Sequence, residues 1–146
     1  MAAAQVKIRP MEPEDISEIL DIDRKISGQS RAMTYTNLFR ETMGGEIGVS
    51  YVAEDSDKMV GFVLAHLTFV RETITEACVI QIFGVDPDYQ RKGVARQLFH
   101  KLLEECRAKG IKSVRVMVAE KDAPLRTFFE HIGFTRAQYI GYNMTP

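Results

Sequence analysis

One stretch of the chain, VDPDYQRKGVARQLF at residues 85–99, constrains the fold more than any other. The apolar run at residues 77–85 predicts a buried strand that ends ahead of Pro87. A short basic loop (residues 86–93) follows, and a strongly amphipathic helical pattern begins directly after it. A helix N-terminus carries unpaired N–H groups and a partial positive charge. This order of elements therefore predicts a socket for a phosphorylated ligand.

The composition of this region supports the same interpretation. Arg91, Lys92 and Arg96 concentrate positive charge in a chain whose net charge is -1. Gly93 and the small Ala95 let a bulky anion approach the backbone closely. The spacing of a Walker A loop is missing, and a single glycine does not make a dinucleotide fingerprint. From these residues alone, an ordinary strand–turn–helix with solvated cations is the alternative interpretation.

Length and composition predict one soluble globular domain over residues 1–146, because 45% of the residues are hydrophobic and 27% are charged. The 19 basic and 20 acidic residues give no bulk attraction to nucleic acid, so no nucleic-acid partner is expected. The two cysteines, Cys78 and Cys106, lie in apolar patterns and are expected to be reduced core thiols. No Cys/His spacing is typical of a zinc site, and no metal is expected.

The N-terminus and the apolar segments indicate where in the cell the protein is expected. The first five residues do not have the pattern of a signal peptide. The most apolar segment, residues 60–70, is interrupted by His66 and is too short to cross a bilayer. We therefore expect a cytoplasmic protein with no membrane partner.

Periodicity and turn signals predict alternating strands and helices. Gly110 is expected to close the helix that begins at Val94. The order predicts a mixed sheet with helices packed on its faces. The predicted strands are residues 6–9, 51–54, 59–69, 77–85, 113–118 and 134–143, and the predicted helices are residues 13–26, 34–43, 94–106 and 123–132.

The segment Gln90-x-x-Gly93-x-Ala95 resembles the Q/R-x-x-G-x-G/A signature of the GNAT superfamily of acyl-CoA N-acyltransferases. The similarity covers nearly the whole chain, and the order of elements agrees. The resemblance implies an α/β (α+β) fold with a mixed, mostly antiparallel central sheet flanked by helices. Segments similar to the family's opening, third strand and closing helix-to-strand segment are Ile8-Arg9-Pro10 with Glu14-Asp15, residues 59–62, and residues 128–134.

The resemblance also implies an activity. Such a protein is an N-acetyltransferase that moves the acetyl group of acetyl-CoA to a primary amine of a small molecule or peptide, by direct attack in a ternary complex. No metal takes part, and a homodimer is compatible with the family. The backbone of residues 90–96 would hold the pyrophosphate, residues 83–85 would bond the pantetheine arm like an added strand, and an N–H near Val85 would stabilise the oxyanion. Gly84 fits either the opening of the strand or a simple bulge. The implied CoA-binding residues are Phe83, Gly84, Val85, Gln90, Arg91, Lys92, Gly93, Val94, Ala95, Arg96 and Phe129.

The chain departs from the family pattern at three positions, and one of them holds the proton donor in many members. Phe129 stands where many members have a proton-donating Tyr, and Asp122 stands where an Asn often begins that helix. Met117 aligns with a Glu found in members that acetylate ribosomal-protein N-termini. Phe129 cannot donate a proton, although it can pack against the cofactor. A non-catalytic acyl-CoA-binding regulatory domain is therefore the alternative function.

Two residues are candidates for a catalytic role, Gln81 and Tyr142. Gln81 is expected on the same strand face as Phe83 and Val85, where it orients a water or serves as a polar core residue. Tyr142, on the last predicted strand, either donates a proton or packs as a strand aromatic. His66 either relays a proton or is a structural histidine.

The acceptor is expected to bind residues 27–45 and 71–76, which match segments that vary within the family. The second segment contains Glu72 and Glu76. This acidic pair either favours a cationic amine or belongs to a solvated turn. The sequence names neither the acceptor nor the length of the acyl chain.

Overall fold

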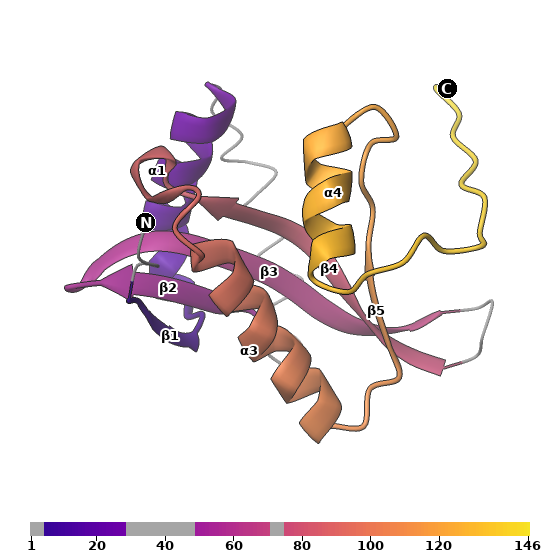
Figure 1. The fold of residues 1–146 in the computed structure, drawn as a ribbon, viewed down its shortest axis with the longest axis horizontal. Helices are drawn as coiled ribbons and strands as arrows, with labels where there is room; N and C mark the ends of the chain where they lie inside the picture. The colour runs from indigo at the N-terminus through magenta and orange to yellow at the C-terminus, as the bar shows by residue number, and fades with distance from the viewer. Residues whose placement is uncertain (1–4, 29–48, 71–74) are drawn as a thin grey trace. The chain divides into compact units, whose positions relative to one another are not determined.

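The computed structural model describes residues 5–28, 49–70 and 75–146 (Figure 1). The chain divides into two compact units, Met1–Val116 and Met117–Pro146, which are presented one after the other. The predicted helix at residues 34–43 lies outside the described residues, as does most of the chain expected to bind the acceptor.

The first unit is built on a five-stranded sheet whose strands follow the chain order. Strands β1 to β4 pair antiparallel, and β4 pairs parallel with β5. This arrangement confirms the predicted mixed, mostly antiparallel sheet. The strands are β1 (Lys7–Pro10), β2 (Tyr51–Asp55), β3 (Lys58–Val70), β4 (Thr75–Val85) and β5 (Ser113–Val116).

Two helices, α1 (Ile16–Ser27) and α3 (Val94–Ala108), cover opposite faces of this sheet (Figure 1). Each follows a short 3-10 turn, η1 (Pro13–Asp15) before α1 and η2 (Pro87–Tyr89) before α3. Both helices bury one apolar stripe, as their 3.6-residue periodicity predicts. The α1 face buries Met11, Ile19, Ile22, Val52, Met59, Phe62 and Leu64, and α3 contributes Val94, Leu98, Phe99, Leu102 and Cys106 to the core of the opposite face. Both cysteines are free and buried, as predicted.

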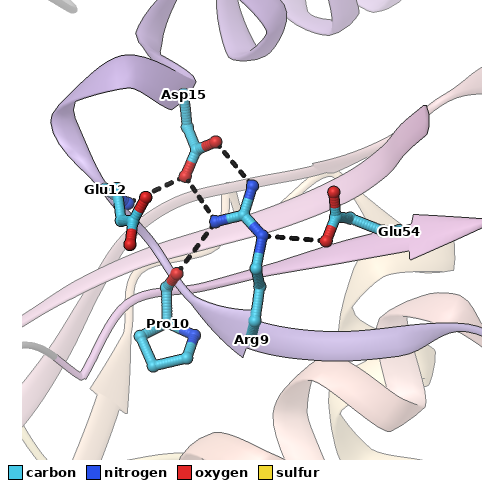
Figure 2. Close-up of polar contacts among 5 residues, drawn as sticks. All are labelled: Arg9, Pro10, Glu12, Asp15 and Glu54. Carbon is cyan, nitrogen blue, oxygen red and sulfur yellow. Dashed lines mark hydrogen bonds and ion pairs between the residues drawn. The ribbon is translucent and has the colours of Figure 1, made fainter. Parts of the chain in front are cut away.

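An arginine on β1 fastens the start of α1 to the sheet (Figure 2). The Arg9 guanidinium donates to both carboxylate oxygens of Asp15, over 2.7 and 2.9 Å, and its Nε donates to Glu54 on β2 over 2.8 Å. Asp15 is 5% exposed and also accepts the Glu12 N–H. Burial alone would raise the pKa of Asp15, but the hydrogen bonds from Arg9 and Glu12 hold it below the usual range. The hydrogen bond to Asp15 in turn raises the pKa of Arg9.

The second unit contains one described helix, α4 (Ala123–His131). Asp122 is its N-cap and accepts the Leu125 N–H over 3.2 Å, so the Asp in place of the family's Asn still caps the helix. Phe129 is buried and packs edge to face against Phe128 and Phe134.

The prediction of a final strand over residues 134–143 is wrong. No strand is present in the described chain beyond Gly133, and β5 ends at Val116 instead of residue 118. The side chains of Ile140 and Tyr142 are 79% and 94% exposed. An apolar–polar pattern produces a strand only where a neighbouring strand accepts its backbone hydrogen bonds, and the pattern alone cannot supply that partner.

The described part of the chain lacks the features that a membrane-spanning helix or a metal site would need. None of its helices is long and apolar enough to span a bilayer. Across residues 5–28, 49–70 and 75–146, no group of three or more His, Cys, Asp or Glu side chains is placed to hold a metal ion.

Candidate functional site

The C-terminal end of β4 extends beyond its parallel pairing with β5 in the first unit. β4 pairs with β5 only where Ala77–Ile80 faces Ser113–Val116, and β4 continues to Val85. Residues 81–85 of β4 therefore lie beyond the part of this edge that β5 covers. A ligand that binds there adds to the sheet as a further strand.

A β-bulge lies where β4 leaves β5. Leu64 pairs with Ile82 and Ala65 pairs with Ile80, so Gln81 is the extra residue on β4. The Gln81 side chain is exposed, and its Nε2 lies 2.9 Å from Nδ1 of His66.

The bulge overturns the prediction that Gln81 shares a face with Phe83 and Val85. Phe83 packs edge to face on Phe99 of α3, with 5.1 Å between ring centroids. On β3, a Cβ on Gly61 would lie 3.0 Å from Cγ1 of Val94 on α3, so Gly61 and, by alternation along the strand, Leu67 point to the α3 face. His66 is next to Leu67 on the strand and points to the other face, together with Gln81. One inserted residue is enough to break the alternation on which the prediction depended.

Gly84 is required by close packing. A Cβ on Gly84 would lie 3.0 Å from Cδ1 of Ile26 and 3.0 Å from Cε1 of Phe62. The glycine therefore lets α1 and β3 approach the end of β4. It is not the site of the bulge, which lies at Gln81.

Asp86 starts the basic loop and fixes its path. The Asp86 side chain is 1% exposed. Its N–H donates to the Val60 carbonyl over 2.8 Å, its carbonyl accepts the Tyr89 N–H over 2.8 Å, and its Oδ1 accepts the Asp88 N–H over 3.0 Å. Burial alone would raise the pKa of Asp86, but hydrogen bonds from Lys25 and the Asp88 N–H keep it below the usual range.

Tyr89 and Gln90 attach the basic loop to β2 and β4. The Tyr89 hydroxyl donates to Oδ2 of Asp55 over 2.7 Å, and this bond raises the pKa of Tyr89. Nζ of Lys92 lies 5.3 Å from the centroid of the Tyr89 ring, close enough for a cation–π contact. The Gln90 side chain donates to the Val85 carbonyl over 3.1 Å and ties the loop to the end of β4.

Helix α3 begins without a side-chain cap. Its N-cap residue, Gly93, has a φ of +81°, and no side chain caps the first turn. Arg91 also has a left-handed backbone, with a φ of +64°, which costs an L-residue about 1 kcal/mol. The first N–H groups of a helix have no partner within the helix. This helix end can therefore bind an anion, and the strained arginine beside it is typical of a functional loop.

A comparison with known families identifies this strand–loop–helix. The model of the Acetyltransferase (GNAT) family matches residues 14–134. The chain belongs to the Acetyltransferase (GNAT) family. The match includes the C-terminal end of β4, the basic loop and α3, so the GNAT resemblance inferred from residues 90–95 is confirmed.

Curated relatives and a solved structure agree with the GNAT assignment. The chain is 29% identical over 93 residues to a ribosomal protein bS18 alanine N-acetyltransferase of Escherichia coli (strain K12), a match that covers 64% of this chain and 59% of that protein. It is 39% identical over 64 residues to a mycothiol acetyltransferase of Beutenbergia cavernae, covering 41% of this chain and 22% of that protein. The fold is similar to that of AAC(6')-Iy in complex with a bisubstrate analogue of CoA, with a TM-score of 0.81, 14% identity, and coverage of 98% and 99% of the two chains.

Most of the predicted GNAT site residues are neighbours in the sequence itself, and their roles stay predictions. The residues from Phe83 to Arg96 form one continuous segment with Gln81 next to its start. The Val94 side chain is 1% exposed and belongs to the core, so only its backbone is available to a ligand. Phe129 and Tyr142 belong to the second unit, and their roles stay predictions.

Sequence reasoning missed the residues that support the GNAT loop. Asp55, Lys25 and Val60 all contact the basic loop or its first residue, although they lie far from it in the chain. The available signal was Asp86 itself, a carboxylate placed directly after an apolar strand. Such a group is buried only with a partner.

Proposed function

We propose that this chain is an acetyl-CoA-dependent N-acetyltransferase that moves an acetyl group to a primary amine of a small molecule or peptide, by direct attack in a ternary complex. One observation carries the proposal: the end of β4 that extends beyond β5 leads directly into the basic loop and the N-terminus of α3, which no side chain caps. CoA has an extended thiol-bearing arm with a pyrophosphate at its end. This order of groups matches a strand end that is followed by an anion site. Membership of the GNAT family and relatives named as N-acetyltransferases favour this function over a non-catalytic acyl-CoA-binding domain.

In the proposed donor site, successive parts of CoA contact successive parts of the segment from Phe83 to Arg96. The backbone of residues 83–85 binds the pantetheine arm, and the backbone of residues 90–96 binds the pyrophosphate. The side chains of Arg91 and Arg96 are exposed beside the helix end, where they add positive charge. Gly93 lacks a Cβ, so the pyrophosphate can approach the backbone closely.

The chemistry requires a bound amine that has lost its proton. The nitrogen of the neutral amine forms a bond to the thioester carbonyl carbon and gives up a proton, the carbon–sulfur bond breaks, and the departing thiolate takes up a proton, so that the products are an amide and the free thiol of CoA. We assign an oxyanion-stabilising role to a backbone N–H near Val85 and the orientation of a water to Gln81, which lies where β4 leaves β5. Tyr142 is our candidate for the proton donor, since Phe129 has no proton to give.

We also propose that the two units form one domain of residues 1–146, because the family match at residues 14–134 extends across both. The matched region spans 59% of the Escherichia coli relative, so substrates of whole relatives are not transferred to this chain. The proposed location is cytoplasmic, and a homodimer is compatible with this function.

Binding of CoA tests the donor site. A ligand at 100 times its Kd stabilises the native state by about 2.7 kcal/mol, or about 5–10 °C in Tm for a chain of this length. We expect CoA and acetyl-CoA to raise the Tm by this amount, and Gly93→Glu to abolish the shift because it adds a side chain and a negative charge. Gly110→Glu is the matched control, since Gly110 follows the same helix with a φ of +73° and open space around it.

Two results would overturn the proposal. One is the absence of a Tm shift in the wild type at millimolar CoA and acetyl-CoA. The other is a Tm shift that Gly93→Glu retains in full, as Gly110→Glu does, which would place the phosphate site elsewhere. Turnover is tested separately, as CoA released from acetyl-CoA above the hydrolysis background with a panel of amines. Release with at least one amine distinguishes an enzyme from a binding domain.

A further inference from the structure

Helix α1 contacts the end of β4 through its last turn. Nζ of Lys25 donates to Oδ2 of Asp86 over 2.9 Å. The next residue, Ile26, places its Cδ1 only 3.0 Å from where a Cβ of Gly84 would lie. We call Lys25 and Ile26 the α1 clamp, because one makes a charged contact and the other an apolar contact with the same strand end.

The charged half of the α1 clamp acts on the residue that organises the basic loop. Every polar group of Asp86 is engaged: its N–H, its carbonyl and both carboxylate oxygens. Among the described residues, Lys25 is the cation that hydrogen-bonds this buried carboxylate. Without Lys25, Oδ2 would lose its donor, and a buried carboxylate with an unsatisfied oxygen is costly. The loop would then relax to bring Asp86 into contact with water.

We propose that Lys25 is a positioning residue for CoA binding: it holds Asp86, and through Asp86 it keeps the basic loop in the conformation that receives the pyrophosphate. The inference rests on the proposed function, because it concerns the same site. Lys25 is not assigned a contact with CoA. Its effect passes through the Asp86 carboxylate, which also accepts the Asp88 N–H and therefore sets the path of the loop.

The neighbouring residue, Arg24, supplies a matched control. Arg24 carries the same charge as Lys25 and lies in the same last turn of α1. Its ion-pair partner, however, is Asp21 of the same helix, at 3.4 Å. The end of the helix is held independently, because the Gly28 N–H donates to the Arg24 carbonyl over 2.8 Å. Lys25 and Arg24 are 51% and 55% exposed, so replacing either by Met leaves the core intact.

The experiment compares wild type, Lys25→Met, Lys25→Arg and Arg24→Met. The Kd for CoA is measured by isothermal titration calorimetry, and hydrogen exchange of the Asp88 and Tyr89 amides is measured without ligand. We expect Lys25→Met to raise the Kd about five- to tenfold, because a charge-assisted hydrogen bond to a buried group is lost. Lys25→Arg should restore the Kd to within about twofold, since an arginine can donate to the same oxygen. The two amides should exchange faster in Lys25→Met alone.

The outcomes separate the inference from the proposed function. If wild type binds CoA and Lys25→Met binds it equally well, the inference fails while the proposed function stands. If Arg24→Met weakens binding as much as Lys25→Met, the effect is one of net charge, and the positioning role is refuted. If wild type does not bind CoA, the proposed function fails. In that case faster exchange of the Asp88 and Tyr89 amides in Lys25→Met would still show that Lys25 holds the loop, and unchanged exchange would overturn that as well.

Discussion

The contact between Arg9 and Asp15 offers a quantitative test of how α1 is fixed to the sheet. Substitution Asp15→Asn keeps the shape of the side chain, removes its charge, and leaves one oxygen to accept from the guanidinium (Figure 2). The wild-type carboxylate accepts two hydrogen bonds from Arg9 and one from the Glu12 N–H. A hydrogen bond to a charged group contributes about 1.5–3 kcal/mol.

The expected magnitude follows from these contacts. Asp15→Asn loses one of the two bonds from Arg9 and weakens the other. Arg9 is 25% exposed and keeps its bond to Glu54, so part of the loss is recovered by water and by that partner. We expect the free energy of unfolding to fall by about 2–3 kcal/mol, which lowers the Tm by about 5–10 °C. Urea denaturation at pH 7 measures the change, and Glu14→Gln in the same turn is the matched control, since Glu14 is exposed.

The pH dependence of this difference supplies a second readout. The pKa of Asp15 is lowered in the folded protein. Its contribution to stability is therefore fully present above the pKa of the unfolded chain, about 3.9, and is lost as the pH falls through the lower folded pKa. The gap between wild type and Asp15→Asn should be constant from pH 8 to about pH 5 and should close in acid. A gap no larger than that of Glu14→Gln, or one that persists unchanged below the folded pKa, would refute the reasoning.

Two further predictions concern the core of the first unit. Burial raises the pKa of Tyr51 to about 12, so its contribution to stability is present below the unfolded value of about 10 and is lost as the pH rises through 12. The difference in absorbance at 295 nm between wild type and Tyr51→Phe checks this, and ionisation near pH 10 in the folded protein would contradict it. Gly61→Ala places a Cβ 3.0 Å from Cγ1 of Val94 and 3.3 Å from the Gly84 carbonyl. We expect it to cost about 1–3 kcal/mol by overpacking, measured by urea denaturation, whereas unchanged stability would show that α3 can move away.

The sheet could be predicted because its signals are local. The apolar run at residues 77–85 and the turn at residues 55–58 each specify a strand end within a few residues of sequence. The final strand could not be predicted in the same way. Residues 134–143 have a strand-like pattern, but a strand also needs a partner, and nothing in a pattern of side chains reports which neighbour is present.

The candidate site likewise has a part with local sequence signals and a part that depends on contacts between distant residues. The part proposed to bind an anion lies within residues 85–96, where a helix start, a glycine and adjacent cations are signals from neighbouring residues. The orientation of Gln81 was mispredicted because one extra residue on β4 reverses the side on which it points. Lys25 is 61 residues away from Asp86 in the sequence, and no short motif links them.

The charge of Asp86 explains why the loop needs a support from a distant helix. A carboxylate at the start of an anion-binding loop would repel the pyrophosphate unless a cation neutralised it. The carboxylate is nevertheless useful, because its oxygen and carbonyl accept the Asp88 and Tyr89 N–H groups and turn the chain sharply after β4. A lysine from α1 meets both conditions, since it satisfies the second oxygen and cancels the charge at 2.9 Å without occupying the loop. If the basic loop receives the pyrophosphate as we propose, the buried Asp86 and the distant Lys25 act together at that site, and a change in either alone should weaken the binding of CoA.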